Sequence, residues 1–219
     1  MPESGRKIFY GWYIVGVAFF AHFMAVGTGF YAINAFMEPL CELRGWTRTD
    51  VNMALVMGTF CGLIGQLLYG TLVMKIGVRV LMVFGALLAG VSFMFLITSE
   101  SLFRFYILYM LLYLGNGAYG GIVANTAVNN WFVLKRGKAM GIATAGISVS
   151  GAFIPLFAMI LIAKTSLPFT AICIGSMIIL IAPFAWLFVK NWPEDYGMAP
   201  DGFLLTASNP DTAIGGLMS

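Results

Sequence analysis

The sequence predicts an all-α membrane protein whose chain crosses the bilayer six times. The 219 residues are 60% hydrophobic and 10% charged, with a mean hydropathy of +0.91, whereas soluble domains carry about 25% charged residues. Six stretches lack Asp, Glu, Lys and Arg altogether, and each reaches the roughly 20 residues that a helix needs to span a bilayer. Because lipid offers no hydrogen bonds to the backbone, we expect each stretch to be a helix.

The charge-free stretches give the expected helices in chain order. The stretches are residues 8–37, 51–74, 80–99, 105–134, 139–163 and 165–189. They predict helices over residues 12–37, 51–74, 80–98, 105–133, 139–163 and 168–189, in one transmembrane bundle of residues 1–190. Residues 191–219 contain prolines, glycines and acids without a helical period. This composition predicts a cytoplasmic tail or the start of a central linker.

The loop charges predict the orientation of the bundle. Eight cations lie on the side of the N-terminus, namely Arg6, Lys7, Lys75, Arg79, Lys135, Arg136, Lys138 and Lys190. Four lie on the other side, namely Arg44, Arg48, Arg104 and Lys164. By the positive-inside rule we expect both termini in the cytoplasm. The lipid bilayer of the cell (inner or plasma) membrane is thus the first expected partner of this multi-pass chain.

Several classes of chemistry find no support in the sequence. The cysteines Cys41, Cys61 and Cys173 are scattered and show no metal-ligand spacing. The cations form no tract suited to nucleic acid, and the phosphate-binding pattern of ATP-driven proteins does not occur. We therefore expect no enzyme, no catalytic residues, no metal, no cofactor and no nucleic-acid partner.

A short glycine pattern occurs in both the first and the fourth expected helix. Residues 27–32 read GTGFYA and residues 115–120 read GNGAYG, so both follow Gly-x-Gly-x-Tyr-small. These helices would open the two halves of a three-plus-three repeat, in which glycine interruptions at matching positions indicate the substrate site of transporters. Tyr31 and Tyr119 are then equivalent positions. Two interpretations remain open, a pair of phenols facing a central cavity or glycines and tyrosines that only pack helices.

Polar side chains near these glycines are the candidates for a substrate cavity. The set comprises Tyr31, Asn34, Tyr113, Asn116 and Tyr119. Tyr113 and Asn116 share one face of their helix, and Asn34 is one turn from Tyr31. Their hydroxyl and amide groups suit a carboxylate or another small polar solute, although hydrogen bonds between helices explain them equally well.

His22 is the candidate for proton coupling. It is the only histidine of the chain, and no other group at membrane depth titrates near neutral pH. A neutral histidine bonded to a neighbouring helix is the alternative. No carboxylate accompanies it in the helices, and carboxylates are the usual members of proton pathways.

The turn between the second and third expected helices carries a family resemblance. Residues 69–82 read YGTLVMKIGVRVLM, which resembles the loop motif of the major facilitator superfamily. The matching positions are Gly70, Leu72, Lys75, Gly77 and Arg79. Met74 stands where that motif has an acid. Four further stretches are similar to bacterial monocarboxylate transporters and relatives of the oxalate–formate antiporters: FYGWYIVGVAFFAHF, FMEPLCELRGWTRTDVNMAL, NNWFVLKRGKAMGIATAGISVSGAFIPL and WPEDYGMAPDG.

The resemblance implies both a fold and a function. Such proteins consist of two six-helix halves, and this chain resembles the N-terminal half. It implies a secondary transporter of small organic anions that works by alternating access. A second half is then an expected partner, whether missing, separately encoded or an identical copy. A truncated half without transport activity and a six-helix channel are the alternatives.

Overall fold

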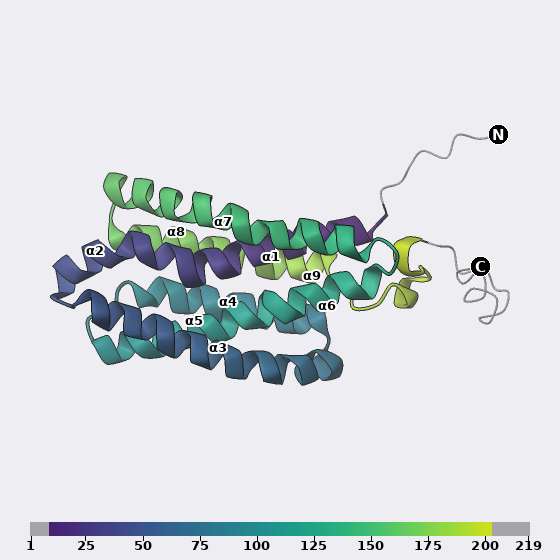
Figure 1. Ribbon diagram of the computed structural model, residues 1–219, viewed down its shortest axis with the longest axis horizontal. Coiled ribbons are helices and arrows are strands. Elements are labelled where there is room, and N and C mark those ends of the chain that lie inside the picture. Colours follow the sequence, from purple (N-terminus) through teal and green to yellow (C-terminus); the bar gives the residue numbers. More distant parts are fainter. Residues whose placement is uncertain (1–8, 203–219) are drawn as a thin grey trace.

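In the computed structural model, which describes residues 9–202, six long apolar helices run back and forth along one axis (Figure 1). The spans are Gly11–Arg44, Arg48–Ile76, Val78–Leu96, Leu102–Trp131, Arg136–Lys164 and Leu167–Phe188. Each is long and apolar enough to cross a bilayer. The six predicted helices are confirmed, and the chain is a multi-pass membrane protein.

Three of the spans are interrupted and three are continuous. The first consists of α1 (Gly11–Val26), the π-helix η1 (Gly27–Tyr31) and α2 (Ala32–Arg44). The fourth consists of α5 (Leu102–Tyr119) and α6 (Gly121–Trp131), and the sixth of α8 (Leu167–Ile179) and α9 (Ile181–Phe188). The continuous spans are α3 (Arg48–Ile76), α4 (Val78–Leu96) and α7 (Arg136–Lys164), and the short turns η2 (Glu194–Tyr196) and η3 (Pro200–Gly202) follow α9.

Local sequence explains where the first two spans end and begin. α2 continues past Glu38 to Arg44, further than the charge-free stretch predicted, because the Glu38 side chain is 74% exposed and needs no burial. Gly45 then ends the helix with φ +67°, a left-handed conformation that glycine adopts without strain. α3 begins with a capping box, in which Thr47 and Asp50 each accept a hydrogen bond from the other's backbone N–H.

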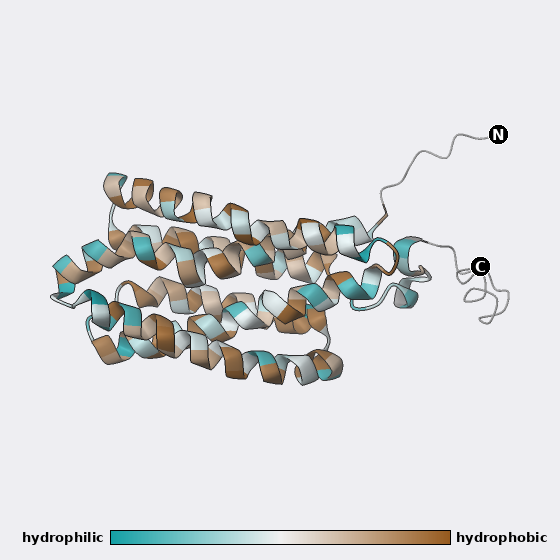
Figure 2. Ribbon diagram, in the orientation of Figure 1, coloured by the Kyte–Doolittle hydropathy of each residue, from teal (hydrophilic) through white to brown (hydrophobic). Residues whose placement is uncertain are grey.

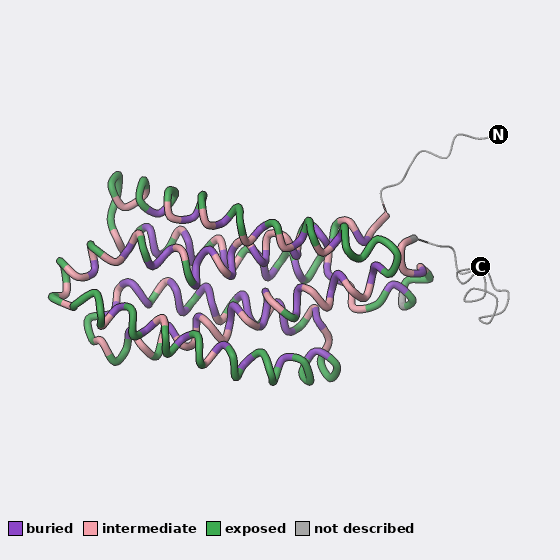
Figure 3. Tube along the Cα trace, viewed as in Figure 1, coloured by how far each residue is buried: buried purple, intermediate pink, exposed green. Residues whose placement is uncertain are grey.

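The first and fourth spans occupy the middle of the bundle. In Figure 1 α7 lies along the upper edge and α3 along the lower side, the first span runs between them and the fourth span crosses α3, while α4, α8 and α9 form a more distant layer. The tube in Figure 3 is mostly exposed along those two edges. Only 28% of the apolar window of α3 and 22% of that of α7 is buried, against 56% and 50% in the first and fourth spans. Two edge helices thus carry long uncovered faces.

Polar residues gather toward the two ends of the bundle (Figure 2). The terminal end holds the Gly77 turn, residues 132–135 and residues 190–202, and the described chain both begins and ends there. At the distal end Arg44 and Arg48 approach Glu100 and Glu38 to 4.0 Å and 3.8 Å. Arg6, Lys7 and residues 203–219 lie outside the described residues.

The start of the expected tail lies against the terminal end. Gly77 links α3 to α4 with φ +82°, and a side chain there would collide with Asn191. The backbone N–H of Arg79 donates to Oδ1 of Asn191 (3.2 Å), and the Asn130 amide donates to the Asn191 carbonyl oxygen (2.9 Å). These two residues of the loop motif, Gly77 and Arg79, therefore fix the turn and hold the chain that follows α9.

Candidate functional site

A recess of about 270 Å³ opens on the face shared by the first span, α3 and α5, and we call it the polar recess after the few polar side chains in its largely apolar lining. It is lined by Ala25, Val26, Gly29, Phe30, Thr59, Gly62, Leu63, Gln66, Tyr113, Asn116, Gly117 and Gly121. The recess lies beside η1, in the middle of the first span, and beside the junction of α5 with α6. It is thus placed near the centre of the membrane-spanning length.

The first glycine pattern forms the π-turn η1. In this wider turn the N–H of Ala32 bonds to the carbonyl of Gly27, five residues earlier. Two carbonyls of this region accept hydrogen bonds from α5 side chains. The Asn116 amide donates to Ala25 O (3.0 Å), and the Tyr109 hydroxyl donates to Gly29 O (2.7 Å). The irregular backbone is therefore satisfied by the neighbouring helix, as membrane depth requires.

The second glycine pattern ends α5. Gly120 is extended at φ −100° and ψ −156°, Gly121 has φ +49°, and α6 starts there. The backbone of Gly120 lies close to Ala25 of α1, since a side chain on Gly120 would approach the Ala25 methyl group to 2.7 Å. Both patterns thus mark helix irregularities, and the two irregularities meet at the contact of the first and fourth spans.

The structure brings only part of the predicted cavity set together. Tyr113 and Asn116 line the recess. Tyr119 lies behind it, fully buried, where its hydroxyl donates to Oδ1 of Asn116 (2.9 Å). Tyr31 packs against α7 at Gly151, and Asn34 is exposed on α2. Neither Tyr31 nor Asn34 is among the residues that line the recess.

The Asn116 side chain is already engaged by the protein. Its amide nitrogen bonds to Ala25 and its oxygen accepts from Tyr119, so it ties α5 to α1. The side chains left to donate to a solute are Gln66 and Tyr113, while the Thr59 hydroxyl donates to Leu55 O (2.7 Å) and keeps its oxygen as an acceptor. Sequence reasoning did not select Thr59 or Gln66, although residues 59, 62, 63 and 66 recur at helical spacing on one face of α3.

No charged side chain lines the recess within the described residues 9–202. Hydroxyl and amide groups can orient a small polar solute and donate hydrogen bonds to a carboxylate. They do not supply the cation that usually balances an anion at membrane depth. The polar groups of the recess are therefore uncharged.

His22 lies apart from the recess, at the contact of α1 with α6. It is 2% exposed, and its Nε2–H donates to Oδ1 of Asn125 (3.0 Å). One turn further along α6, the buried Oδ1 of Asn129 has no hydrogen-bond partner within the described residues. The histidine is thus part of a polar seam between the two central spans.

Comparison with known proteins identifies the family. The profile of the Major Facilitator Superfamily matches residues 9–200, which is nearly all of the described chain. The chain belongs to the Major Facilitator Superfamily. The resemblance inferred from the loop motif and from the four further stretches is confirmed, and the six-helix bundle is consistent with one half of the superfamily fold.

Two relatives within the superfamily cover much of the chain. The oxalate:formate antiporter of Oxalobacter formigenes is 32% identical over 173 residues, which are 76% of this chain and 40% of the relative. The MFS-type transporter pytF of Aspergillus terreus is 27% identical over 195 residues, 88% of this chain and 64% of the relative. The chain thus spans less than two thirds of the length of each of these superfamily members.

Proposed function

We propose that this chain is the N-terminal six-helix half of a secondary transporter for small organic anions of the monocarboxylate type. The observation that best supports this proposal is the polar recess at the two helix irregularities. Transporters built from repeats hold their substrates near the bilayer midplane, at interrupted helices, and expose them alternately to either side. The similarity to an antiporter named for oxalate and formate supports small carboxylates as the substrate class.

A second six-helix half is the proposed partner, supplied by the same polypeptide, by a separate chain or by a second copy. The uncovered faces of α3 and α7 support this proposal. On α7 the small residues Gly137, Gly141, Ala145 and Ser148 recur along one exposed face. Small residues let helices approach closely, which favours their association in lipid. The exposed Met74 and Gly70 of α3 would meet the same partner.

The charges indicate what each half would contribute to substrate binding. In this half Thr59, Gln66 and Tyr113 would orient the solute by hydrogen bonds. The cation that balances the carboxylate would come from the second half, because this recess has none. The excess of Lys and Arg on the side of the N-terminus supports a cytoplasmic location of both termini.

His22 is the proposed proton-coupling group of this half. Its burial against α6 and its bond to Asn125 place a titratable ring between the two central spans. Replacement by asparagine in an active transporter would then alter the pH dependence of transport. An unchanged pH profile would leave His22 only the role of joining α1 to α6.

The test joins this chain to the C-terminal half of the Oxalobacter antiporter and measures exchange of labelled oxalate and formate in proteoliposomes. We expect saturable exchange by the fusion and none by a monomer of the 219-residue chain. In the fusion, Tyr113→Phe and Gln66→Ala should raise KM, whereas Tyr106→Phe, on the same helix outside the recess, should not. Saturable uptake by a monomer of this chain would overturn the half-transporter proposal, and unchanged KM values would remove the recess from it.

A further inference from the structure

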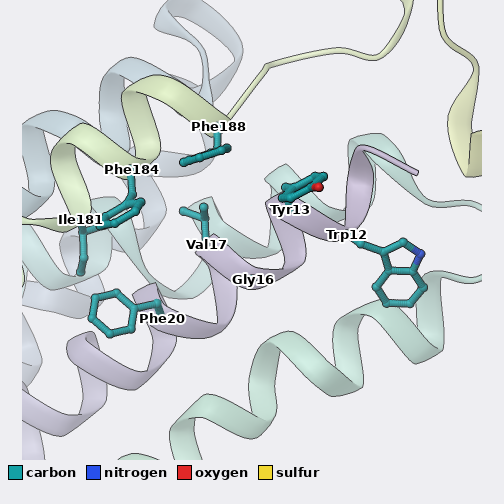
Figure 4. A pocket seen from close by; sticks show the side chains of 8 residues that line it. All are labelled: Trp12, Tyr13, Gly16, Val17, Phe20, Ile181, Phe184 and Phe188. Atoms are coloured by element: carbon teal, nitrogen blue, oxygen red, sulfur yellow. The ribbon is translucent and has the colours of Figure 1, made fainter. Parts of the chain in front are cut away.

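A second, larger recess lies between α1 and α9 near the terminal end of the bundle (Figure 4). Its volume is about 420 Å³. The side chains that face one another across it are Tyr13, Val17, Phe20, Ile181, Phe184 and Phe188. We call it the α1–α9 groove. It shares no residue with the polar recess, and its lining is almost wholly apolar.

A missing side chain opens the α1–α9 groove. Gly16 is exposed on α1, and a Cβ atom there would meet no other heavy atom within 4 Å. Beside it the rings of Tyr13 and Phe188 stack with centroids 6.2 Å apart at 16°, so aromatic planes form the wall next to the gap. The result is an exposed, apolar slot between two membrane-spanning helices.

Aromatic residues place the groove relative to the membrane surface. Trp186, Trp192 and Tyr196 are 52%, 54% and 46% exposed at the terminal end. Tryptophan and tyrosine collect at the level of the lipid headgroups. The groove begins beside this level and continues along α1 toward Phe20, so it lies at the depth of the acyl chains.

A cation stands at the mouth of the groove. Lys190 places its Nζ 4.6 Å from the ring centre of Tyr10 and 3.6 Å from that of Tyr196. The Tyr10 hydroxyl donates to the Phe188 carbonyl (3.0 Å), and its ring lies 5.8 Å from that of Tyr13. The ammonium group is therefore one aromatic ring away from the groove wall.

A second cation lies on the other side of α9. The Arg79 guanidinium stacks 4.2 Å from the ring centre of Trp186. Cations on aromatic rings at the headgroup level add positive charge where lipid phosphates lie. The α1–α9 groove thus combines an apolar slot with the positive charge of Lys190 at its mouth, while Arg79 lies across α9 from it.

We propose that the α1–α9 groove binds one anionic phospholipid, with an acyl chain along Gly16 and the phosphate beside Lys190. Apolar slots with basic mouths between membrane helices suit such lipids, which are enriched in the cytoplasmic leaflet. The site is separate from the proposed transport function, because it requires only the membrane-spanning bundle and its surrounding lipid.

The test is native mass spectrometry of the purified chain with phosphatidylglycerol or phosphatidylcholine of identical acyl chains. Retention of phosphatidylglycerol should be favoured about fivefold, the ratio expected for one lysine at an anionic surface. A phosphatidylglycerol with a photoreactive acyl chain should attach to peptides of α1 and α9. Equal retention of the two lipids, or attachment elsewhere or to a second copy of the chain, would overturn the proposal.

Two matched pairs of variants separate the slot from the charge. Gly16→Leu places a side chain in the slot, at a position where a Cβ atom meets nothing within 4 Å, and should abolish specific retention. Gly141→Leu, at an equally open glycine of α7, should not. Lys190→Gln should remove the fivefold preference, while Lys164→Gln at the distal end should preserve it. If Gly16→Leu binds lipid like Gly141→Leu, the groove is not the site.

Discussion

The first and fourth spans share one sequence pattern, yet they fold into different irregularities. Gly-x-Gly-x-Tyr-small widens the first span into the π-turn η1, after which the helix continues. The same pattern ends α5 and restarts the helix as α6 at a glycine with φ +49°. The pattern therefore marks where a helix departs from regularity, while its neighbours decide how.

The neighbours differ at the first glycine of the pattern and at its tyrosine. A side chain on Gly27 would meet the side chain of Ile154, whereas one on Gly115 would meet the backbone of Ala89 and Gly85. The tyrosine of the first pattern is half-buried against α7, and that of the second is fully buried. At its first glycine the fourth span thus meets backbone, whereas the first span meets a side chain there. Substitutions at equivalent positions test this difference.

The largest effect is expected for Gly115→Ala. Its new methyl group would lie 2.6 Å from the backbone nitrogen of Ala89, so α4 and α5 must move apart, at a cost of about 2 to 3 kcal/mol of unfolding free energy. Gly27→Ala should cost about 1 kcal/mol, because a side chain can yield. Unfolding of both variants in mixed micelles measures the difference. Equal losses would contradict the contrast.

A smaller effect is expected for Asn116→Leu. Its amide joins α5 to α1 and also satisfies the Tyr119 hydroxyl, so its removal should cost about 1 to 3 kcal/mol. At the equivalent position, the Thr28 hydroxyl donates to the Met24 carbonyl of its own helix (2.7 Å). Thr28→Val should therefore cost about 0.6 kcal/mol, the average for such bonds in membranes. A larger loss for Thr28→Val in the same unfolding assay would reverse the comparison.

The two tyrosines should differ less. Tyr119→Phe removes one buried hydrogen bond to Asn116, at a cost of about 1 kcal/mol. Tyr31→Phe keeps the ring that packs on Gly151 and should leave stability unchanged. Thermal unfolding midpoints of the two variants provide the measurement. A destabilised Tyr31→Phe variant would show that its hydroxyl has a role that packing does not explain.

The smallest effect concerns the loop after the fourth span. Asp201 accepts hydrogen bonds from the N–H groups of Val133, Leu134 and Lys135 at 2.8, 2.6 and 3.1 Å. Partial burial would raise the pKa of this carboxyl, but these bonds and the Lys135 charge outweigh it and hold the pKa below the usual 3.8. The contact should therefore persist above that range and be lost as pH falls through the lowered pKa.

Hydrogen exchange of the three loop amides measures this contact. Asp201→Asn should lower their protection at neutral pH, and the wild-type protection should weaken only in acid. Glu194→Gln, at an exposed acid of the same segment, is the control and should change nothing. Protection that is independent of Asp201 would mean that Trp131 and Asn130, which also bond to the chain after α9, hold the loop without it.

Much of the architecture could be predicted because its causes are local. Exclusion of charge from about 20 successive residues is enough to predict a membrane helix. Gly77 and Arg79 indicated a tight turn that resembles the loop motif of the superfamily. The glycine patterns indicated the irregular positions in the first and fourth spans. The structure of the tail could be predicted only in part, since nothing in its composition shows that Asn191 and Asp201 bind the loops of the bundle.

The membership of the recess could not be predicted in the same way. Tyr31 and Asn34 are as polar as Tyr113 and Asn116, yet only the second pair lines the recess. Thr59 and Gln66 belong to it because α3 packs against α5, a contact that no short pattern encodes.

By itself, the sequence determined the six spans, the irregular positions of the first and fourth spans, and the superfamily. Tertiary structure alone decided which side of each helix is buried, which side forms the recess and which side leaves the α1–α9 groove open. The physical reason is that lipid, and not water, surrounds these helices. Lipid tails are as apolar as leucine, so hydropathy does not distinguish a helix face that meets lipid from one that meets protein. Steric fit between neighbours, as at Gly115 and Gly16, makes that distinction.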